Sequence, residues 1–394
     1  MIDVNDYLHT NVDCGYIIGA LFLDFKRAFD LVNHSILLDK LKKYGVHDTE
    51  LTWFRNYLSG RSQCVCFNGK LSTFRDVSMG IPQGSILGPL LFVIFINDLC
   101  DLNFQKDTKL SLYADDTALF CKAKCVNTVQ NSLQSEFDKI MQWVQANDLK
   151  LNTGKCKVML FGTHKKVRAK QILIQHESQF IEQVDKFKYL GLIFDNFLKF
   201  DKHIDKTCSK ISRSIGFIRQ IKQYLPRKVL IMLYNGLILP HIDYGLILWG
   251  KSSQCFTSKL QRLQNRYARL VLSADFFTPH TSLLRQLNWQ SFLQRVDYQF
   301  CVFMYKIING LAPEYLQELI VFRTPQIPTR YALNSPLLIP KPKTQYMKRS
   351  FQYYGSCLWN KLPICVRNST SLQSFKYQCK ILSSVDRLNP AFPI

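Results

Sequence analysis

Residues 110–122 read LSLYADDTALFCK, in which two apolar runs flank a pair of aspartates, Asp115 and Asp116. Apolar runs on both sides of a short polar turn are typical of a β-hairpin, so we expect the two carboxylates at its tip. A second apolar stretch, IIGALFLDF over residues 17–25, predicts a buried strand that ends at Asp24. Three acidic residues are therefore expected at the ends of neighbouring strands.

The segments around these strands predict an α+β fold. A helix is expected over residues 35–44, a hairpin around Asn68-Gly69, and another helix after the glycine-rich stretch that follows. Apolar residues then recur at spacings of three and four over 126–144, and the strand KVMLF occupies 157–161. This order of elements predicts a mostly antiparallel sheet with helices on one face.

Charge divides the 394 residues into two parts. Residues 1–160 hold 17 Lys and Arg and 17 Asp and Glu, whereas residues 161–394 hold 34 and 12, which accounts for the whole net charge of +22. A neutral first part followed by a strongly basic second part indicates a chemical module attached to a surface for polyanions. Solubilising lysines are the simpler alternative, and composition does not decide between them.

The basic part has mainly helical patterns. One apolar stripe runs between residues 204 and 218, a second basic helix follows near 260–270, and a third is expected over about 283–308. Five prolines within residues 322–350 predict an extended connector. The aromatic stretch FQYYGSCLWNKLP after it is expected to pack back as a small structured piece.

Composition argues against several classes of protein. Thirteen cysteines is an odd number and the N-terminus has no signal region, so we expect reduced thiols in an intracellular protein of the nucleus or cytoplasm, not a secreted one. The longest apolar run, residues 86–96, is too short to cross a bilayer, which argues against a membrane protein. The sequence contains no GxxxxGK[ST] loop and no CxxC pair, so neither an ATP motor nor a zinc knuckle is indicated.

Carboxylates at the ends of adjacent strands repel one another unless a multivalent cation lies between them. Hard oxygen ligands with few other donors suit Mg²⁺, which completes its shell with water and substrate phosphates. Two such ions, roughly 3.5–4 Å apart, can activate a 3′-hydroxyl and stabilise a departing pyrophosphate. The alternative is that Asp115-Asp116 is ordinary turn chemistry.

Five segments with polar or glycine-containing motifs occur in order along the chain. They are FLDFKRAFD (22–30), GIPQGSILGP (80–89), YADD (113–116), NTGK (152–155) and KYLGLIFD (188–195). Together they resemble the palm motifs of reverse transcriptases, most closely those of non-LTR retrotransposons of the LINE type. A looser similarity continues to the C-terminus. The resemblance implies an RNA-directed DNA polymerase that adds dNTPs to a primer 3′-hydroxyl by two-metal nucleotidyl transfer.

The resemblance also implies a division into regions. A right-hand polymerase palm is expected over residues 1–195, a thumb-like basic helical region over 196–250, and a basic, mostly helical C-terminal region over 251–394. Proteins of this kind carry a fingers subdomain and an endonuclease ahead of the first aspartate, and the 23 residues before Asp24 cannot hold them. We therefore expect an N-terminally truncated chain with impaired activity. The alternative is a catalytically inactive remnant that still binds nucleic acid.

Roles for the acidic and neighbouring residues follow from the resemblance. It implies that Asp24 and Asp115 bind two Mg²⁺ ions, for which Mn²⁺ can substitute, with Asp116 as a supporting carboxylate. Lys155 matches a lysine that stabilises or protonates the leaving pyrophosphate, although an ordinary surface lysine is equally consistent with the sequence. Phe29 falls where the family places a steric gate against the ribose 2′-hydroxyl, and a core phenylalanine is the alternative.

Further residues are implied to contact nucleotide, primer and template. Gln83 and Gly84 resemble the turn that meets the incoming nucleotide, with a plain Gly-Pro turn as the alternative. The hairpin around Tyr189, Leu190 and Gly191 resembles a primer grip, which a merely packed hairpin would also explain. Basic residues on or beside a thumb-like helix are implied to neutralise phosphates, unless they form a solvated face. They are Lys202, Lys206, Lys210, Arg213, Arg219 and Lys222. The implied partners are an RNA template, a DNA primer and dNTPs, with no membrane; the oligomeric state is not indicated.

Overall fold

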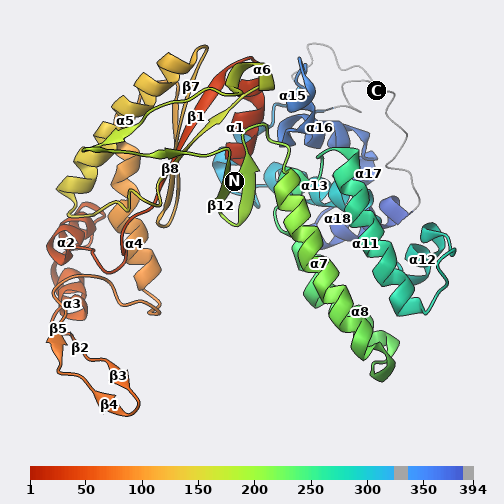
Figure 1. Ribbon diagram of the computed structural model, residues 1–394, viewed down its shortest axis with the longest axis horizontal. Helices are drawn as coiled ribbons and strands as arrows, with labels where there is room; N and C mark the ends of the chain where they lie inside the picture. Colours follow the sequence, from red (N-terminus) through yellow and green to blue (C-terminus); the bar gives the residue numbers. More distant parts are fainter. Residues whose placement is uncertain (324–335, 385–394) are drawn as a thin grey trace. The chain divides into compact units, whose positions relative to one another are not determined.

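The structure is a computed structural model that describes residues 1–323 and 336–384, and it divides the chain into two units. One unit is Gly15–Phe187, and the other joins Met1–Cys14 to Lys188–Ile394. Figure 1 shows the elements of both units coloured along the sequence. The region boundaries expected after residues 195 and 250 remain predictions.

A five-stranded sheet forms the centre of the Gly15–Phe187 unit, in the order β11-β8-β1-β7-β6. The central strand β1 (Ile17–Leu23) is antiparallel to both β7 (Asp116–Ala123) and β8 (Lys157–Phe161). At one edge β6 (Thr108–Tyr113) pairs with β7, and at the other the short β11 (Glu182–Gln183) runs parallel to β8. All residues of β1 are buried, as its continuous apolar run predicts.

Helix α5 (Val126–Ala146) packs against β1 and β7 (Figure 1). Gly19 in β1 permits this approach, because a Cβ at that position would lie 2.5 Å from Cγ1 of Val129. The predicted apolar spacing is confirmed by the buried side of the helix. That side includes Val129, Leu133, Phe137, Ile140 and Val144. Each fully buried large apolar side chain contributes roughly 1.5–3 kcal/mol, so this face fixes α5 on the sheet.

Three helices lie between β1 and β6 in the chain. They are α2 (His34–Lys43), α3 (Asp48–Leu58) and α4 (Gly88–Ile96). The sequence predicted α2 and α4, and the Asn33 side chain starts α2 by accepting hydrogen bonds from the next amides. The sequence did not predict α3, which buries only Leu51 and Leu58 and therefore carries a weak apolar pattern.

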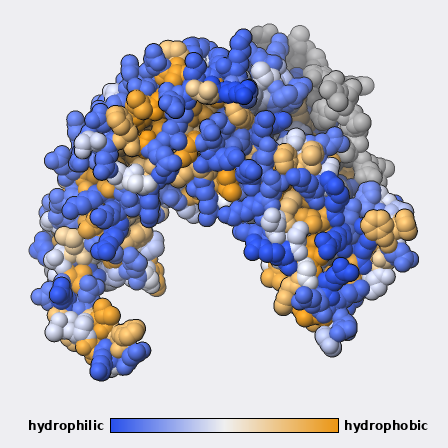
Figure 2. Space-filling view, viewed as in Figure 1, coloured by the Kyte–Doolittle hydropathy of each residue, from blue (hydrophilic) through white to orange (hydrophobic). Residues whose placement is uncertain are grey.

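One long hairpin with two paired sections connects α3 to α4. Strand β2 (Ser62–Gln63) pairs with β5 (Arg75–Asp76), and β3 (Cys66–Phe67) pairs with β4 (Lys70–Leu71). The hairpin expected at Asn68-Gly69 is confirmed, and both residues have positive φ, 48° and 76°, as a two-residue type I′ turn requires. Apolar side chains around this hairpin remain exposed (Figure 2).

A short helix and two small hairpins follow β8. They are α6 (His164–Val167), the hairpin of β9 (Gln175–His176) and β10 (Gln179–Phe180), and the hairpin of β12 (Lys186–Tyr189) and β13 (Leu192–Asp195). The chain passes from one unit to the other within β12.

The second unit is helical, as the sequence predicts. Helix α7 (Asp201–Ile221) packs on α11 (Gln254–Leu272) and buries the isoleucines of the predicted stripe. Shorter helices connect these two along the chain. They are α8 (Arg227–Leu233), α9 (Leu239–Asp243) and α10 (Leu246–Trp249).

Two expectations for the C-terminal region were wrong. The helix expected over 283–308 is two helices, α12 (His280–Leu287) and α13 (Phe292–Ile308). The chain breaks at Asn288, whose φ of 52° ends α12, and Ser291 begins α13 with a capping box. The expected extended connector over 322–350 contains a helix, α15 (Gln345–Arg349); its residues 324–335 lie outside the described residues.

The aromatic stretch after the connector is structured, as expected. It forms α16 (Phe351–Lys361), which is followed by α17 (Ile364–Arg367) and α18 (Leu372–Ser384), and both α16 and α18 pack on α13. The buried side chains of α16 include Phe351, Leu358 and Trp359.

Helix α1 (Ile2–Asp13) belongs to this unit and binds the C-terminal helices. The Asp6 carboxylate accepts hydrogen bonds from the backbone amides of Phe351 and Gln352, at 2.6 and 2.7 Å. Burial raises the pKa of Asp6 to about 7, despite these two donors. Within the two described ranges, no helix is both long enough and apolar enough to cross a membrane.

Candidate active site

Strand register brings the three predicted aspartates to one end of the sheet. Leu23 of β1 pairs with Thr117 of β7, so Asp24, which follows Leu23, lies at the level of Asp116 on the neighbouring strand. Asp115 is in the two-residue turn that joins β6 to β7, directly before Asp116. The first aspartate therefore lies beside the turn pair, although more than 90 residues separate them in the chain.

The β6–β7 turn has an unusual backbone. Ala114 has a φ of 52°, in the left-handed region that costs an L-residue of this kind roughly 1–2 kcal/mol. The turn leaves Asp115 and Asp116 exposed, next to the half-buried strand β6 and the mostly buried strand β7. Such strain is typical of places where the fold fixes a functional side chain.

The carboxylates interact electrostatically. Partial burial raises the pKa of Asp116, and the negative charges of Asp115 and Asp24 raise it further. Like charges raise a pKa in this way only at short range, so the three carboxylates lie close enough to repel one another. Within residues 1–323 and 336–384, however, no three His, Cys, Asp or Glu side chains are arranged to hold a metal ion.

Lys155 provides a cation at this cluster. Its Nζ lies 3.8 Å from Oδ2 of Asp24, and both side chains are partly exposed. The backbone positions it, because the amide of Asn152 donates to the carbonyl of Asp24 at 2.8 Å and Phe25 forms a β-bridge with Leu151. The NTGK motif therefore runs alongside the end of β1, and the structure brings Lys155 to Asp24.

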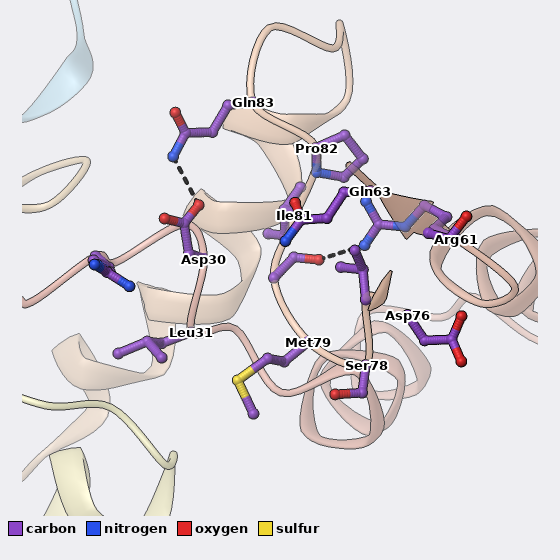
Figure 3. Close-up of a pocket in the computed structure, with 14 residues that line it drawn as sticks. Asp30, Leu31, Arg61, Gln63, Asp76, Ser78, Met79, Ile81, Pro82 and Gln83 are labelled. Carbon is purple, nitrogen blue, oxygen red and sulfur yellow. Dashed lines mark hydrogen bonds between the residues drawn. The ribbon is translucent and has the colours of Figure 1, made fainter. Parts of the chain in front are cut away.

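A cavity of about 820 Å³ lies along the glycine-rich segment (Figure 3). Gln83 is on its wall, where Nε2 donates a hydrogen bond to Oδ1 of Asp30 at 2.8 Å. On the other side, Nη2 of Arg61 donates to the carbonyl of Gly80 at 2.8 Å. The cavity has the size of a small-molecule site.

Two glycines shape the segment beside this cavity for different reasons. Gly80 has a φ of 87°, and a Cβ there would lie 2.6 Å from the carbonyl oxygen of Asp30. Gly84 has a φ of 80° but open space where a Cβ would be, so only its backbone conformation requires glycine. Another group could therefore approach the backbone of Gly84.

Phe29 has features of both alternatives predicted for it, a core phenylalanine and a steric gate. Its ring stacks on Phe92 of α4, with centroids 4.4 Å apart, while the residue remains half-buried. The stacking is ordinary core packing, and the accessible part of the ring is what a steric gate needs. The gate therefore stays a prediction.

Sequence reasoning missed two arginines at the cavity. Arg27 and Arg61 both line it, next to the glycine-rich segment. Arg27 belongs to the FLDFKRAFD segment and has a φ of 49°, which no sequence pattern indicated. Arg61 comes directly before β2, and its guanidinium also donates from Nε to the carbonyl of Leu58 at 3.0 Å. The position of Arg61, a cation directly before a predicted hairpin, was the one sequence signal for either arginine.

The predicted primer-grip residues form the hairpin turn between β12 and β13. Leu190 and Gly191 have φ values of 45° and 83°, and Tyr189 is buried. The Tyr244 hydroxyl donates to the carbonyl of Leu190 at 2.6 Å, and a Cβ on Gly191 would lie 2.9 Å from that hydroxyl. The hairpin itself is confirmed, and its role toward a primer remains a prediction.

The six predicted basic residues separate into two surfaces of the helical unit. Lys202, Lys206, Lys210 and Arg213 are exposed and follow one another along a single face of α7, at spacings of four and three. Arg219 and Lys222 instead line a pocket of about 340 Å³ together with Arg266 and Arg269 of α11. Their phosphate-binding role remains a prediction for both surfaces.

A known protein family matches the part of the chain that contains this site. Residues 9–194 match the family described as reverse transcriptase (RNA-dependent DNA polymerase). These residues belong to the reverse transcriptase family. The matched range contains Asp24, Asp115, Asp116 and Lys155, so the candidate site lies inside the reverse transcriptase domain.

Relatives of the chain come from mobile elements of Drosophila melanogaster. The probable RNA-directed DNA polymerase from transposon BS is 29% identical over 71% of this chain, and that from transposon X-element is 26% identical over 75%. The RNA-directed DNA polymerase from mobile element jockey is 28% identical over 72% of the chain. The match covers 32%, 32% and 31% of these relatives, so the chain spans about a third of their length. The predicted resemblance to non-LTR reverse transcriptases is confirmed.

Two solved structures that match part of the chain are telomerases. The apo telomerase from Candida tropicalis matches 72% of this chain and 46% of its own, with 13% identity and a TM-score of 0.41. The Candida albicans telomerase in complex with a telomeric RNA fragment has a TM-score of 0.34 over 75% of this chain and 52% of its own.

Proposed function

We propose that the reverse transcriptase domain carries the polymerising centre of an RNA-directed DNA polymerase of a non-LTR retrotransposon. The observation that carries this proposal is the convergence of Asp24 with Asp115 and Asp116 at one end of the sheet, beside Lys155. Segments from three separate places in the chain supply these four side chains. In this proposal the sheet and its helices act as the palm, and α7 acts as part of the thumb.

The acidic cluster suits divalent cations in its chemistry. Its donors are carboxylate oxygens without thiols or imidazoles, which is the preference of Mg²⁺. The repulsion that raises the pKa of Asp116 is the kind that a bound cation relieves. When bound, such ions activate the primer 3′-hydroxyl and offset negative charge on the departing pyrophosphate.

The residues of the chain then divide the work. Asp24, Asp115 and Asp116 would hold the ions, once their side chains turn toward a common point. In doing so Asp24 would leave Lys155, whose ammonium group would become free to neutralise the pyrophosphate or to give it a proton. Gln83, Gly84 and the two arginines of the cavity would contact the incoming dNTP, with Phe29 beneath its sugar.

Primer extension on poly(rA)/oligo(dT) with Mg²⁺ and dTTP tests this function. We expect extension by the wild-type chain and its loss in Asp115→Asn, because the variant keeps the shape of the turn but loses a negative charge. Asp138→Asn is the matched control, since Asp138 is an exposed acid on α5, away from the strand ends. Equal extension by Asp115→Asn and Asp138→Asn would remove the assignment. Binding of the hybrid without extension by the wild type would support the inactive-remnant alternative instead.

A further inference from the structure

Asp30 is an exposed acid on the wall of the cavity of about 820 Å³, and it has no part in the proposed nucleotide contacts. Its Oδ1 accepts the hydrogen bond that Nε2 of Gln83 donates at 2.8 Å (Figure 3). A carboxylate repels phosphate groups, so an acid on this wall does not serve to bind the triphosphate of a nucleotide. The bond to Gln83 therefore indicates a different task for this side chain.

The backbone fixes Asp30 against the glycine-rich segment. The amide of Ile81 donates to the carbonyl of Phe29 at 2.8 Å, and the amide of Gly80 donates to the carbonyl of Val32 at 2.7 Å. The backbone of Asp30 passes between these two bonds, so close that a Cβ on Gly80 would lie 2.6 Å from its carbonyl oxygen. Because the two segments are already paired, their side chains can meet with little further loss of conformational entropy.

The turn that carries Gln83 is also fixed on the side of α4. The Ser85 hydroxyl donates to the carbonyl of Pro82 at 2.8 Å and accepts from the amide of Gly88, at the start of α4, at 2.9 Å. The backbone of Gln83 is therefore held on both sides, whereas its long side chain is exposed and free to rotate. The bond to Asp30 removes that freedom before any ligand arrives.

The chemistry of the bond also decides which end of the Gln83 amide stays available. An ionised carboxylate only accepts hydrogen bonds, so Asp30 holds the NH₂ group of Gln83. The flipped amide is excluded, because it would place its oxygen against the carboxylate oxygens. The carbonyl oxygen Oε1 of Gln83 is therefore the atom presented to a ligand, and it recognises a hydrogen-bond donor.

We propose that Asp30 is a positioning residue for nucleotide binding, which orients the amide of Gln83 so that Oε1 accepts a hydrogen bond from the incoming dNTP. The inference rests on the proposed function for the identity of the ligand. It adds a carboxylate that acts through another side chain and does not touch the nucleotide itself. Loss of Asp30 should therefore raise the KM for the dNTP, leave the rate at saturation nearly unchanged, and matter only while Gln83 is present.

An exchange of the two side-chain types tests the proposal in primer extension by the full chain, with saturating poly(rA)/oligo(dT) and varied dTTP. Asp30→Ala should raise the KM for dTTP about tenfold, whereas Asp39→Ala, which removes an exposed acid of α2, should keep the wild-type value. Gln83→Glu should raise the KM at least as much, because two carboxylates then face each other. Adding Asp30→Asn to Gln83→Glu restores the bond with donor and acceptor exchanged and the net charge unchanged. This double variant should return to within a few-fold of the wild type.

A second double variant separates positioning from an independent role. Asp30→Ala should have no further effect on the KM in a chain that already carries Gln83→Ala, and additive effects would overturn the proposal. A wild-type KM in Asp30→Ala, or no rescue of Gln83→Glu by Asp30→Asn, would overturn it as well.

Nucleotide binding can also be measured without turnover. With a primer that ends in a dideoxynucleotide, dTTP should slow the release of the hybrid to a competitor, and the variants should require more dTTP in the same order as their KM values. A wild-type chain that shows this order but no extension would refute the proposed catalysis and not the role of Asp30. Extension by the wild type with no dependence on Asp30 would refute that role and not the catalysis.

Discussion

The two units of the chain use their charged residues in opposite ways. Residues 15–187 contain 22 basic and 17 acidic residues, and three of the acids meet at the ends of strands. The remaining residues contain 29 basic and 12 acidic residues, and there buried acids such as Asp6 bind backbone amides while lysines stay exposed. The difference indicates that one unit concentrates negative charge for chemistry and the other presents positive charge for binding. If so, substitutions should separate turnover from affinity.

After the aspartates themselves, the largest effect is expected at Lys155. Lys155→Met should slow primer extension at least about 100-fold, since a proton donor or a fixed charge at a leaving group typically contributes this much. Hybrid affinity should not change, because the residue belongs to the acidic cluster. The control is Lys157→Met, whose partner is Glu182 at 2.8 Å. Single-turnover rates that match between the two variants would make Lys155 an ordinary surface lysine.

The exposed face of α7 should affect the affinity for the hybrid and not the rate of extension. Replacing Lys202, Lys206, Lys210 and Arg213 together by alanine should weaken hybrid binding by about 100-fold at low salt and flatten the salt dependence by three to four ions, at about 0.9 per phosphate. The rate at saturating hybrid should stay within a few-fold of the wild type. A salt dependence that does not change would identify this face as solvated and would contradict a binding role for the positive charge of this unit.

Phe29 tests selectivity within the acidic unit. If the ring lies under the sugar, Phe29→Val should raise the use of ribonucleotides relative to deoxynucleotides by about tenfold or more, because the clash with a 2′-hydroxyl is removed. If it only packs on Phe92, the variant should lose roughly 1–3 kcal/mol of stability and keep its selectivity. Competition between a ribonucleotide and the matching deoxynucleotide in one reaction measures selectivity, and denaturant unfolding measures stability. Together they distinguish a steric gate from core packing.

Asp6 of the basic unit should change local stability with pH, and neither turnover nor affinity. Its pKa is raised to about 7 in the folded chain, from an ordinary value of 3.8, so the folded state holds the proton over this range. The stability that it contributes is therefore present below about pH 4 and is lost as pH rises toward 7, by at most about 1.4 kcal/mol per pH unit. Hydrogen-exchange protection of the Phe351 amide, corrected for intrinsic exchange, should fall between pH 5 and 7 and stay flat in Asp6→Asn. Protection that rises with pH would contradict this.

Local patterns predicted much of the fold and of the site. The run ending at Asp24, the hairpin at Asn68-Gly69 and the spacing of α5 are set by neighbouring residues, so periodicity and turn chemistry were sufficient. The break at Asn288 was missed because the apolar pattern continues across it. The docking of α1 on α16 was missed because it depends on residues about 345 positions apart.

The site shows the same limit. Motif order indicated Asp24, Asp115 and Asp116, and the register of β1 with β7 brings them together as expected. Arg61 gave no comparable signal, since it is a single cation before a hairpin. Its relevance comes from a cavity that forms only when distant segments fold together.

Binding of Mn²⁺ is the most direct test of the central claim, that acids from two separate strands form one cation site. Electron paramagnetic resonance can count bound Mn²⁺ on the full chain with a primer–template and a dNTP that cannot be incorporated, independently of turnover. We predict that Asp24→Asn and Asp115→Asn each lose bound Mn²⁺, and that Asp138→Asn does not. Undiminished Mn²⁺ binding by Asp24→Asn would show that the first aspartate is not part of the site, and would contradict a cation site shared by the two strands.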